Sequence, residues 1–150
     1  MKLKHLKHTD TLDFFAVDED AFSSIPMFSD AVQAGFPSPA EDHMDMDLNL
    51  NDHLVQNPSA TFCVKAIGES MKDAGIQSGD IMIVDKSLEP QNRSIVLAVI
   101  DGEFTVKRVN VNDKELYLMP ENSNFSPIKI TEEMDFQVWG VVTYIIHKAV

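Results

Sequence analysis

The stretch IVLAVIDGEFTVKRV, residues 95–109, indicates the fold class of this chain of 150 residues. On both sides of its centre lie β-branched, aliphatic and aromatic residues, which favour strands. Asp101-Gly102 at the centre is a strong signal for a two-residue hairpin turn, because both turn positions require a positive φ that Gly adopts without strain. We therefore predict two antiparallel strands here and a mainly β protein.

Further strand patterns surround this hairpin. They cover residues 61–67, 81–84, 116–119 and 136–146. Each is an alternating or continuous apolar run, and turn residues separate the runs, as expected for half-buried or fully buried strands. The second half of the chain is therefore expected to fold as one strand-rich domain.

A short helix is expected just before these strands. Asn49 or Asn51 can cap it, and Pro58 ends it, because proline lacks the backbone N–H that a helix interior needs. These features divide the chain into an N-terminal arm, residues 1–34, a linker with the short helix, residues 35–57, and a β-rich domain, residues 58–150.

Residues 1–30 carry scattered Phe and Leu among acidic residues without a sustained period, which predicts a loosely ordered arm. Pro37 and Pro39 predict an exposed linker after it. Ser29 to Gly35 could form one helical turn or an extended segment, and the local pattern leaves both open. The basic start resembles a secretory signal, but acidic residues interrupt the apolar middle that a signal needs. We therefore expect a cytoplasmic protein without a membrane span.

The charge of the chain restricts its partners. The formal net charge is −12, and acidic residues outnumber Lys and Arg twofold both up to Ala34 and beyond it. Such a surface repels the phosphates of a nucleic acid. We expect no direct DNA binding. Any function on DNA would therefore depend on a partner protein.

The sequence gives no strong sign of a metal or cofactor. Cys63 is the single cysteine, which excludes an internal disulfide, and its apolar alternating surroundings predict a small buried side chain. The acidic segment from Glu41 to Asp47 has the composition of a solvated stretch, and no second ligand cluster of defined spacing accompanies it. We expect neither a metal nor a cofactor.

Ser70 and Lys107 are the candidate catalytic residues. Ser70 follows a predicted strand behind Gly68, and Lys107 lies within the predicted hairpin strand, on the same face as Thr105. Serine is a poor nucleophile unless a base lies beside it, and a lysine can be that base only when desolvation keeps its amine neutral. The alternatives are an ordinary turn serine and a strand lysine whose ammonium reaches into solvent.

Several motifs resemble one family. They are Gly68-Glu69-Ser70-Met71, Gly75-Ile76, Gly79-Asp80 and the run from Asp101 to Arg108. Together they are similar to the LexA/UmuD family of self-cleaving serine proteases, whose catalytic domain is a signal-peptidase-like β fold, and they are most similar to its UmuD group, the accessory subunits of DNA polymerase V. The resemblance begins near Ile25 and runs to the end, so the first 24 residues have no counterpart in it.

The resemblance implies roles for particular residues. Ser70 is expected to be the nucleophile, Lys107 the base, and Ala34-Gly35 the bond that the protein cuts in itself. Backbone N–H groups of Glu69 and Ser70 are the expected donors to the oxyanion that forms during the attack. The segment around Ala34 would then have to extend in order to enter the active site.

The resemblance also implies a biological role. UmuD proteins cleave themselves when a RecA filament promotes it after DNA damage, and the trimmed homodimer joins a UmuC-type Y-family DNA polymerase in translesion synthesis. LexA-type repressors instead carry a helix-turn-helix domain before the cleavage site, which takes about 60 residues and a basic surface. The N-terminal arm here, residues 1–34, is shorter than such a domain and net acidic, which favours the UmuD role. A LexA-like regulator lacking its DNA-binding domain and a non-catalytic β-rich binding module are the alternatives.

Overall fold

The structure is a computed structural model that describes residues 3–9, 12–18, 24–28 and 44–150. Eleven strands lie in these ranges: β1 (Leu3–His8), β2 (Leu12–Val17), β3 (Ser24–Phe28), β4 (Met44–Asn49), β5 (Thr61–Ala66), β6 (Ile81–Asp85), β7 (Ile95–Ile100), β8 (Glu103–Asn112), β9 (Glu115–Met119), β10 (Ile128–Lys129) and β11 (Phe136–Ile146). One α-helix, α1 (Leu50–Leu54), and two single 3-10 turns, Pro58–Ala60 and Lys72–Ala74, complete the described elements.

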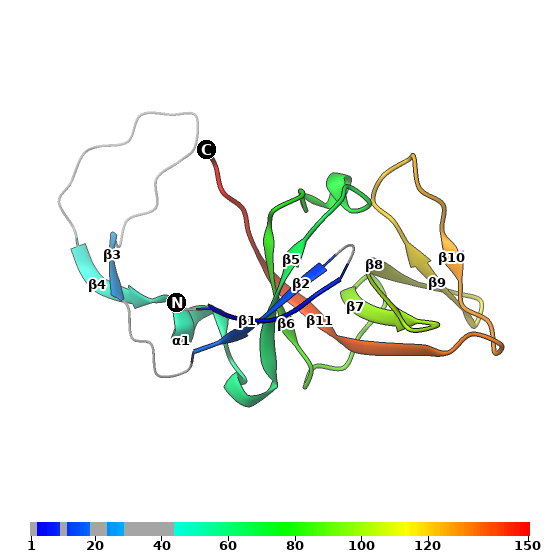
Figure 1. Cartoon of the computed structure of the whole chain (residues 1–150). Coiled ribbons are helices and arrows are strands. Elements are labelled where there is room, and N and C mark those ends of the chain that lie inside the picture. Colours follow the sequence, from blue (N-terminus) through cyan, green and yellow to red (C-terminus); the bar gives the residue numbers. More distant parts are fainter. Residues whose placement is uncertain (1–2, 10–11, 19–23, 29–43) are drawn as a thin grey trace.

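Nine of these strands form one antiparallel sheet in the order β1-β2-β5-β6-β11-β7-β8-β9-β10 (Figure 1). The other two, β3 and β4, pair with each other. The predicted mainly β fold is confirmed. The predicted hairpin joins β7 to β8, where Ile100 pairs with Glu103 and the two turn residues Asp101 and Gly102 have φ values of 49° and 84°.

The long strand β11 joins the two halves of the sheet. It pairs with β7 from Phe136 to Val141 and with β6 from Val141 to Ile146, and its register shifts near Gly140. A Cβ atom at Gly140 would lie 2.6 Å from Cγ1 of Val84 and 2.9 Å from the carbonyl oxygen of Asp85. Only glycine allows this close approach, which lies where β11 passes from pairing with β7 to pairing with β6.

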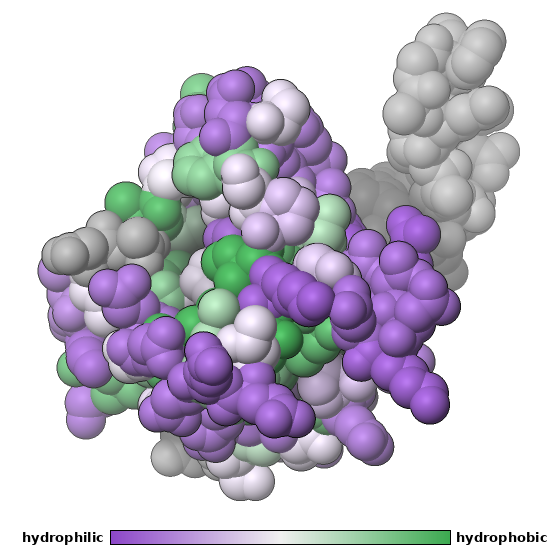
Figure 2. Space-filling model, turned by 90° about the vertical axis from the view of Figure 1, so that its right-hand side faces the viewer, coloured by the Kyte–Doolittle hydropathy of each residue, from purple (hydrophilic) through white to green (hydrophobic). Residues whose placement is uncertain are grey.

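Two apolar clusters form the core. The site cluster, named for its place beside Ser70, contains Leu12, Phe14, Val64, Ala66, Met71, Ile76, Met82, Val84, Leu97 and Val106. The second cluster contains Val96, Ala98, Val109 and Leu118. Successive residues of β7 alternate between the clusters, because neighbouring side chains of a strand point to opposite faces. Much of the exterior is polar, and hydrophilic residues surround a smaller apolar area on the face in Figure 2.

The prediction of a loosely ordered start is wrong for residues 3–8, 12–17 and 24–28, which form strands. β1 and β2 form an antiparallel pair, and β2 pairs with β5 from Leu12 to Ala16. Leu12 and Phe14 alternate into the site cluster. Six residues are too few to give a clear period, and the β5 edge that orders them lies about fifty positions away in the sequence.

The predicted short helix is confirmed as α1. Asn49 is its N-cap, and its side-chain oxygen accepts a hydrogen bond of 3.0 Å from the backbone N–H of Asn51. Within the described ranges, no helix is long and apolar enough to cross a membrane.

Candidate active site

Ser70 lies in the turn that follows β5. The strand ends at Ala66, and the chain reverses at Gly68, whose φ of 104° is a backbone conformation that L residues rarely adopt. The N–H of Gly68 donates a 3.2 Å hydrogen bond to Oγ of Ser78. The predicted position of Ser70, just past a strand and behind a glycine turn, is confirmed.

A distant loop holds the turn that carries Ser70. The N–H of Glu121 donates to the carbonyl oxygen of Ser70 at 2.8 Å, and Nδ2 of Asn122 donates to the carbonyl oxygen of Glu69 at 2.8 Å. The carbonyl oxygen of Glu121 accepts from the N–H of Asp73 at 2.7 Å. No local signal in the sequence links Asn122 to a partner 53 positions away.

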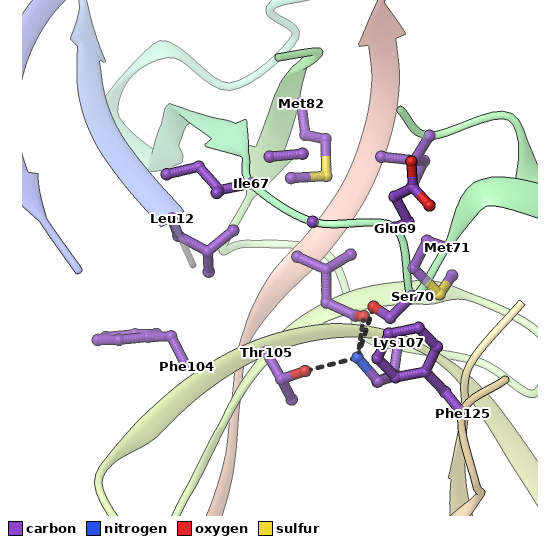
Figure 3. A pocket seen from close by; sticks show the side chains of 14 residues that line it. Leu12, Ile67, Glu69, Ser70, Met71, Met82, Phe104, Thr105, Lys107 and Phe125 are labelled. Atoms are coloured by element: carbon purple, nitrogen blue, oxygen red, sulfur yellow. Dashed lines mark hydrogen bonds between the residues drawn. The ribbon is translucent and has the colours of Figure 1, made fainter. Parts of the chain in front are cut away.

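Lys107 reaches Ser70 from β8. Its Nζ donates to Oγ of Ser70 at 2.9 Å, to Oγ1 of Thr105 at 2.8 Å and to the carbonyl oxygen of Val106 at 3.0 Å (Figure 3). The residue is only 8% exposed. The structure thus brings together the two candidate catalytic residues, which are 37 positions apart, and the lysine does not extend into solvent as its structural alternative required.

Burial shifts the protonation equilibrium of the Lys107 amine. Desolvation lowers the pKa of Lys107 below its ordinary value of 10.5. The three acceptors around Nζ are two hydroxyls and a carbonyl, so none of them is an anion that would stabilise the ammonium. Burial without a hydrogen-bonded anion makes the ammonium less stable, and the neutral amine is the form that can accept a proton from a serine hydroxyl.

Arg108, the next residue, points the other way. It pairs with the carboxylate of Glu121, and its Nη1 donates to the carbonyl oxygen of Arg93 at 2.8 Å. Strand alternation predicts that only one of two adjacent basic residues can face inward, and Lys107 is the one that does. The Arg108–Glu121 ion pair also connects β8 to the loop that holds the Ser70 turn.

A pocket of about 230 Å³ opens beside the two residues. Its walls come from the end of β5, the Ser70 turn and β8, and Leu12 of β2 also lines it (Figure 3). Apolar side chains dominate, among them Met82 and Phe104, and Ile67 and Phe125 are partly exposed lining residues. A mostly apolar pocket with a few polar groups suits a short extended peptide segment.

Some of the remaining candidate residues lie within the described part of the chain and others lie outside it. Ala34 and Gly35, the expected scissile pair, lie outside the described residues. Glu69 lies in the turn beside Ser70, where its carbonyl oxygen also accepts from the N–H of Lys72 at 3.1 Å. Cys63 is fully buried in β5, and burial raises the pKa of its thiol to about 11, so it stays a thiol at neutral pH.

Comparison with known proteins identifies the family. The profile of the Peptidase S24-like family matches residues 26–143. This chain belongs to that family. The family is the one that the LexA/UmuD-like motifs predicted, and β1 and β2 precede the stretch that its profile matches.

Bacterial relatives agree with the family assignment. Protein SamA of Salmonella typhimurium is 46% identical over 130 residues, which are 87% of this chain and 90% of SamA. Protein ImpA of Escherichia coli is 42% identical over 123 residues, or 82% of this chain and 83% of ImpA. Protein MucA of Escherichia coli is 42% identical over 122 residues, or 81% of this chain and 83% of MucA.

Proposed function

We propose that this S24-like peptidase is a self-cleaving serine protease of the UmuD type, with Ser70 as nucleophile and Lys107 as general base. The observation that carries the proposal is the 2.9 Å contact between Nζ of Lys107 and Oγ of Ser70, made by a buried amine whose hydrogen-bond acceptors in the described part of the chain are all uncharged. Family membership supports the same reaction class.

The proposed reaction has two stages. Neutral Lys107 takes the hydroxyl proton of Ser70, and Oγ attacks the carbonyl carbon of Ala34 while N–H groups of Glu69 and Ser70 stabilise the oxyanion. The Ala34–Gly35 bond breaks as Lys107 passes the proton to the leaving amine. A water molecule then attacks the Ser70 ester, Lys107 accepts the proton of that water, and Ser70 regains its hydrogen as the Ala34 carboxylate leaves.

The biological role proposed is that of an SOS mutagenesis protein. A RecA filament would promote the cut by raising the population of molecules whose scissile segment is docked, without adding a catalytic group. The trimmed homodimer would then act with a UmuC-type Y-family polymerase in the cytoplasm. The overall identity to SamA, ImpA and MucA supports this role, and the acidic net charge favours a protein partner over direct contact with DNA.

Intact-mass measurement tests the proposed function. The purified chain is incubated with RecA, single-stranded DNA and a slowly hydrolysed ATP analogue, and the expected products end at Ala34 and begin at Gly35. The Ser70→Ala variant is the control and is expected to stay uncut. A cut at another bond, or a cut in the Ser70→Ala variant, would contradict the proposal.

A further inference from the structure

Strands on the two sides of the proposed cut pair with each other. Ala34-Gly35 lies between β3 and β4 in the sequence, so the cut would leave β1, β2 and β3 on an N-terminal fragment and every later element on a C-terminal fragment. Two strand pairs join these fragments, because β2 pairs with β5 and β3 pairs with β4. Breaking the Ala34–Gly35 bond removes neither of these pairs.

The side chains of β2 anchor the N-terminal fragment in the core of the other fragment. Leu12 is 4% exposed and Phe14 is 5% exposed, and both belong to the site cluster. The centre of the Phe14 ring lies 4.8 Å from that of Phe104 and 6.2 Å from that of Phe62, and both partners follow the cut. Loss of β2 would expose this apolar surface to water, which is unfavourable in proportion to the area exposed.

Polar and charged groups add to this attachment. Nζ of Lys7 in β1 lies 5.6 Å from the centre of the Phe104 ring, a distance at which a cation is attracted to an aromatic face. Nδ2 of Asn51 donates a 3.3 Å hydrogen bond to the carbonyl oxygen of Asp18, the residue after β2. Both contacts join residues on opposite sides of the proposed cut.

Leu12 connects this attachment to the candidate active site. It pairs with Ala66, the last residue of β5, and its side chain lines the same pocket as Ser70 and Lys107 (Figure 3). Because β5 lies between β2 and β6, loss of β2 would also open one edge of β5. Dissociation of the N-terminal fragment would therefore remove part of the pocket wall and uncover a strand edge together.

We propose that the β5 edge and the apolar surface under β2 form a binding site for the chain's own N-terminal fragment, and that β1 and β2 stay bound there after the cut. The immediate product is then a noncovalent complex of the two fragments, held as a peptide strand is held on a sheet edge. The biological meaning of this inference rests on the proposed self-cleavage. It makes dissociation of the fragment a second step, separate from the cut.

A cut that does not depend on Ser70 tests the binding site by itself. The recognition sequence of a site-specific protease is inserted between Ala34 and Gly35 of a Ser70→Ala chain that carries a C-terminal affinity tag. After complete digestion, checked by denaturing mass spectrometry, the tagged fragment is captured on resin and washed. The N-terminal fragment is expected to remain with it in equimolar amount, and loss of that fragment in the wash would overturn the inference.

Two truncations in the N-terminal fragment test whether β2 is its anchor. In the digested chain, Phe14→Ala should speed dissociation of the fragment about a hundredfold or more, since truncating a buried Phe removes packing that supports the complex. The matched control is Leu6→Ala on β1, which truncates a side chain of a residue that is 58% exposed. Its dissociation rate should stay within about threefold of the unaltered fragment. Equal rates for the two variants would overturn the inference.

The same capture after self-cleavage separates this inference from the proposed function. The tagged chain with its native Ser70 is incubated with RecA, single-stranded DNA and a slowly hydrolysed ATP analogue, and residues 1–34 are expected to be captured with the tagged fragment. A chain that never cuts itself, but keeps its N-terminal fragment after digestion by the added protease, contradicts the proposed function alone. A chain that cuts itself and loses the fragment in the wash contradicts the binding site alone.

Discussion

Two hairpins of the same sheet each carry a lysine, and the surroundings of the two lysines are opposite. In the outer hairpin, β1 and β2, Nζ of the exposed Lys7 lies 5.6 Å from the centre of the Phe104 ring. In the inner hairpin, β7 and β8, Lys107 is three positions beyond Phe104 and is buried beside Ser70. Both are lysines on antiparallel strands, yet only one has the surroundings of a base.

The difference comes from what surrounds each lysine. β1 is the last strand of the sheet, so Lys7 keeps its water while its ammonium lies over an aromatic face. At Lys107, β8 pairs with Val96 of β7, and the lysine side chain lies in the pocket against the Ser70 turn, where the residue is 8% exposed. Position in the sheet, and not residue type or strand conformation, therefore determines which lysine loses its hydration.

The largest expected effect separates the two lysines directly. Lys107→Ala should slow self-cleavage by about a thousandfold or more, because general-base assistance contributes roughly 10²–10⁴-fold and no other base contacts Ser70 in the described part of the chain. The rate is measured by intact mass over time at fixed pH. Lys7→Ala is the matched control, and its rate should stay within about fivefold of the unaltered chain, since a surface cation–π contact is weak.

An unchanged rate in Lys107→Ala would remove the distinction between the hairpins. If Lys7→Ala lost as much activity as Lys107→Ala, the distinction between the hairpins would also be lost. Both variants must keep the circular dichroism of the folded protein for this comparison.

The next effect concerns pH. Lys107 can accept a proton only when its amine is neutral, and burial lowers its pKa below 10.5, so the neutral fraction grows with rising pH up to that lowered pKa. Cleavage without RecA should therefore accelerate up to about tenfold per pH unit from pH 7 and level off below about 10.5. A histidine base would instead level off near about pH 6.5.

The rate of purified protein across this pH range measures the profile. The Lys107→Ala variant should show no such rise, and a flat profile above pH 7 in the unaltered chain would exclude Lys107 as the base.

The smallest effect concerns how Lys107 is positioned. Oγ1 of Thr105 accepts a 2.8 Å hydrogen bond from Nζ, which directs the amine toward Ser70. Thr105→Val should slow cleavage about three- to tenfold, because a hydrogen bond of this kind contributes about 0.5–1.5 kcal/mol. Thr105→Ser keeps the hydroxyl and should restore most of the rate. Equal rates for the Val and Ser variants would show that burial alone positions the amine.

Much of this architecture could be predicted from local sequence. The Asp101-Gly102 turn, the apolar runs of β5, β6 and β11, and the helix cap at Asn49 all have signals within a few residues, because turn chemistry and side-chain alternation act over that distance. The motifs around Ser70 and Lys107 also predicted the family and the proximity of the two side chains.

Tertiary structure alone decided the rest. Leu12 and Phe14 belong to the core only because β5 offers them an edge, and Asn122 holds the Ser70 turn across 53 positions. The sequence by itself thus determined strands β5 to β9 and β11, the family and the candidate dyad, since these depend on short-range pattern and residue type. The edge that β2 covers and the burial that lowers the pKa of Lys107 depend on which distant strands become neighbours, and packing of the whole sheet sets that.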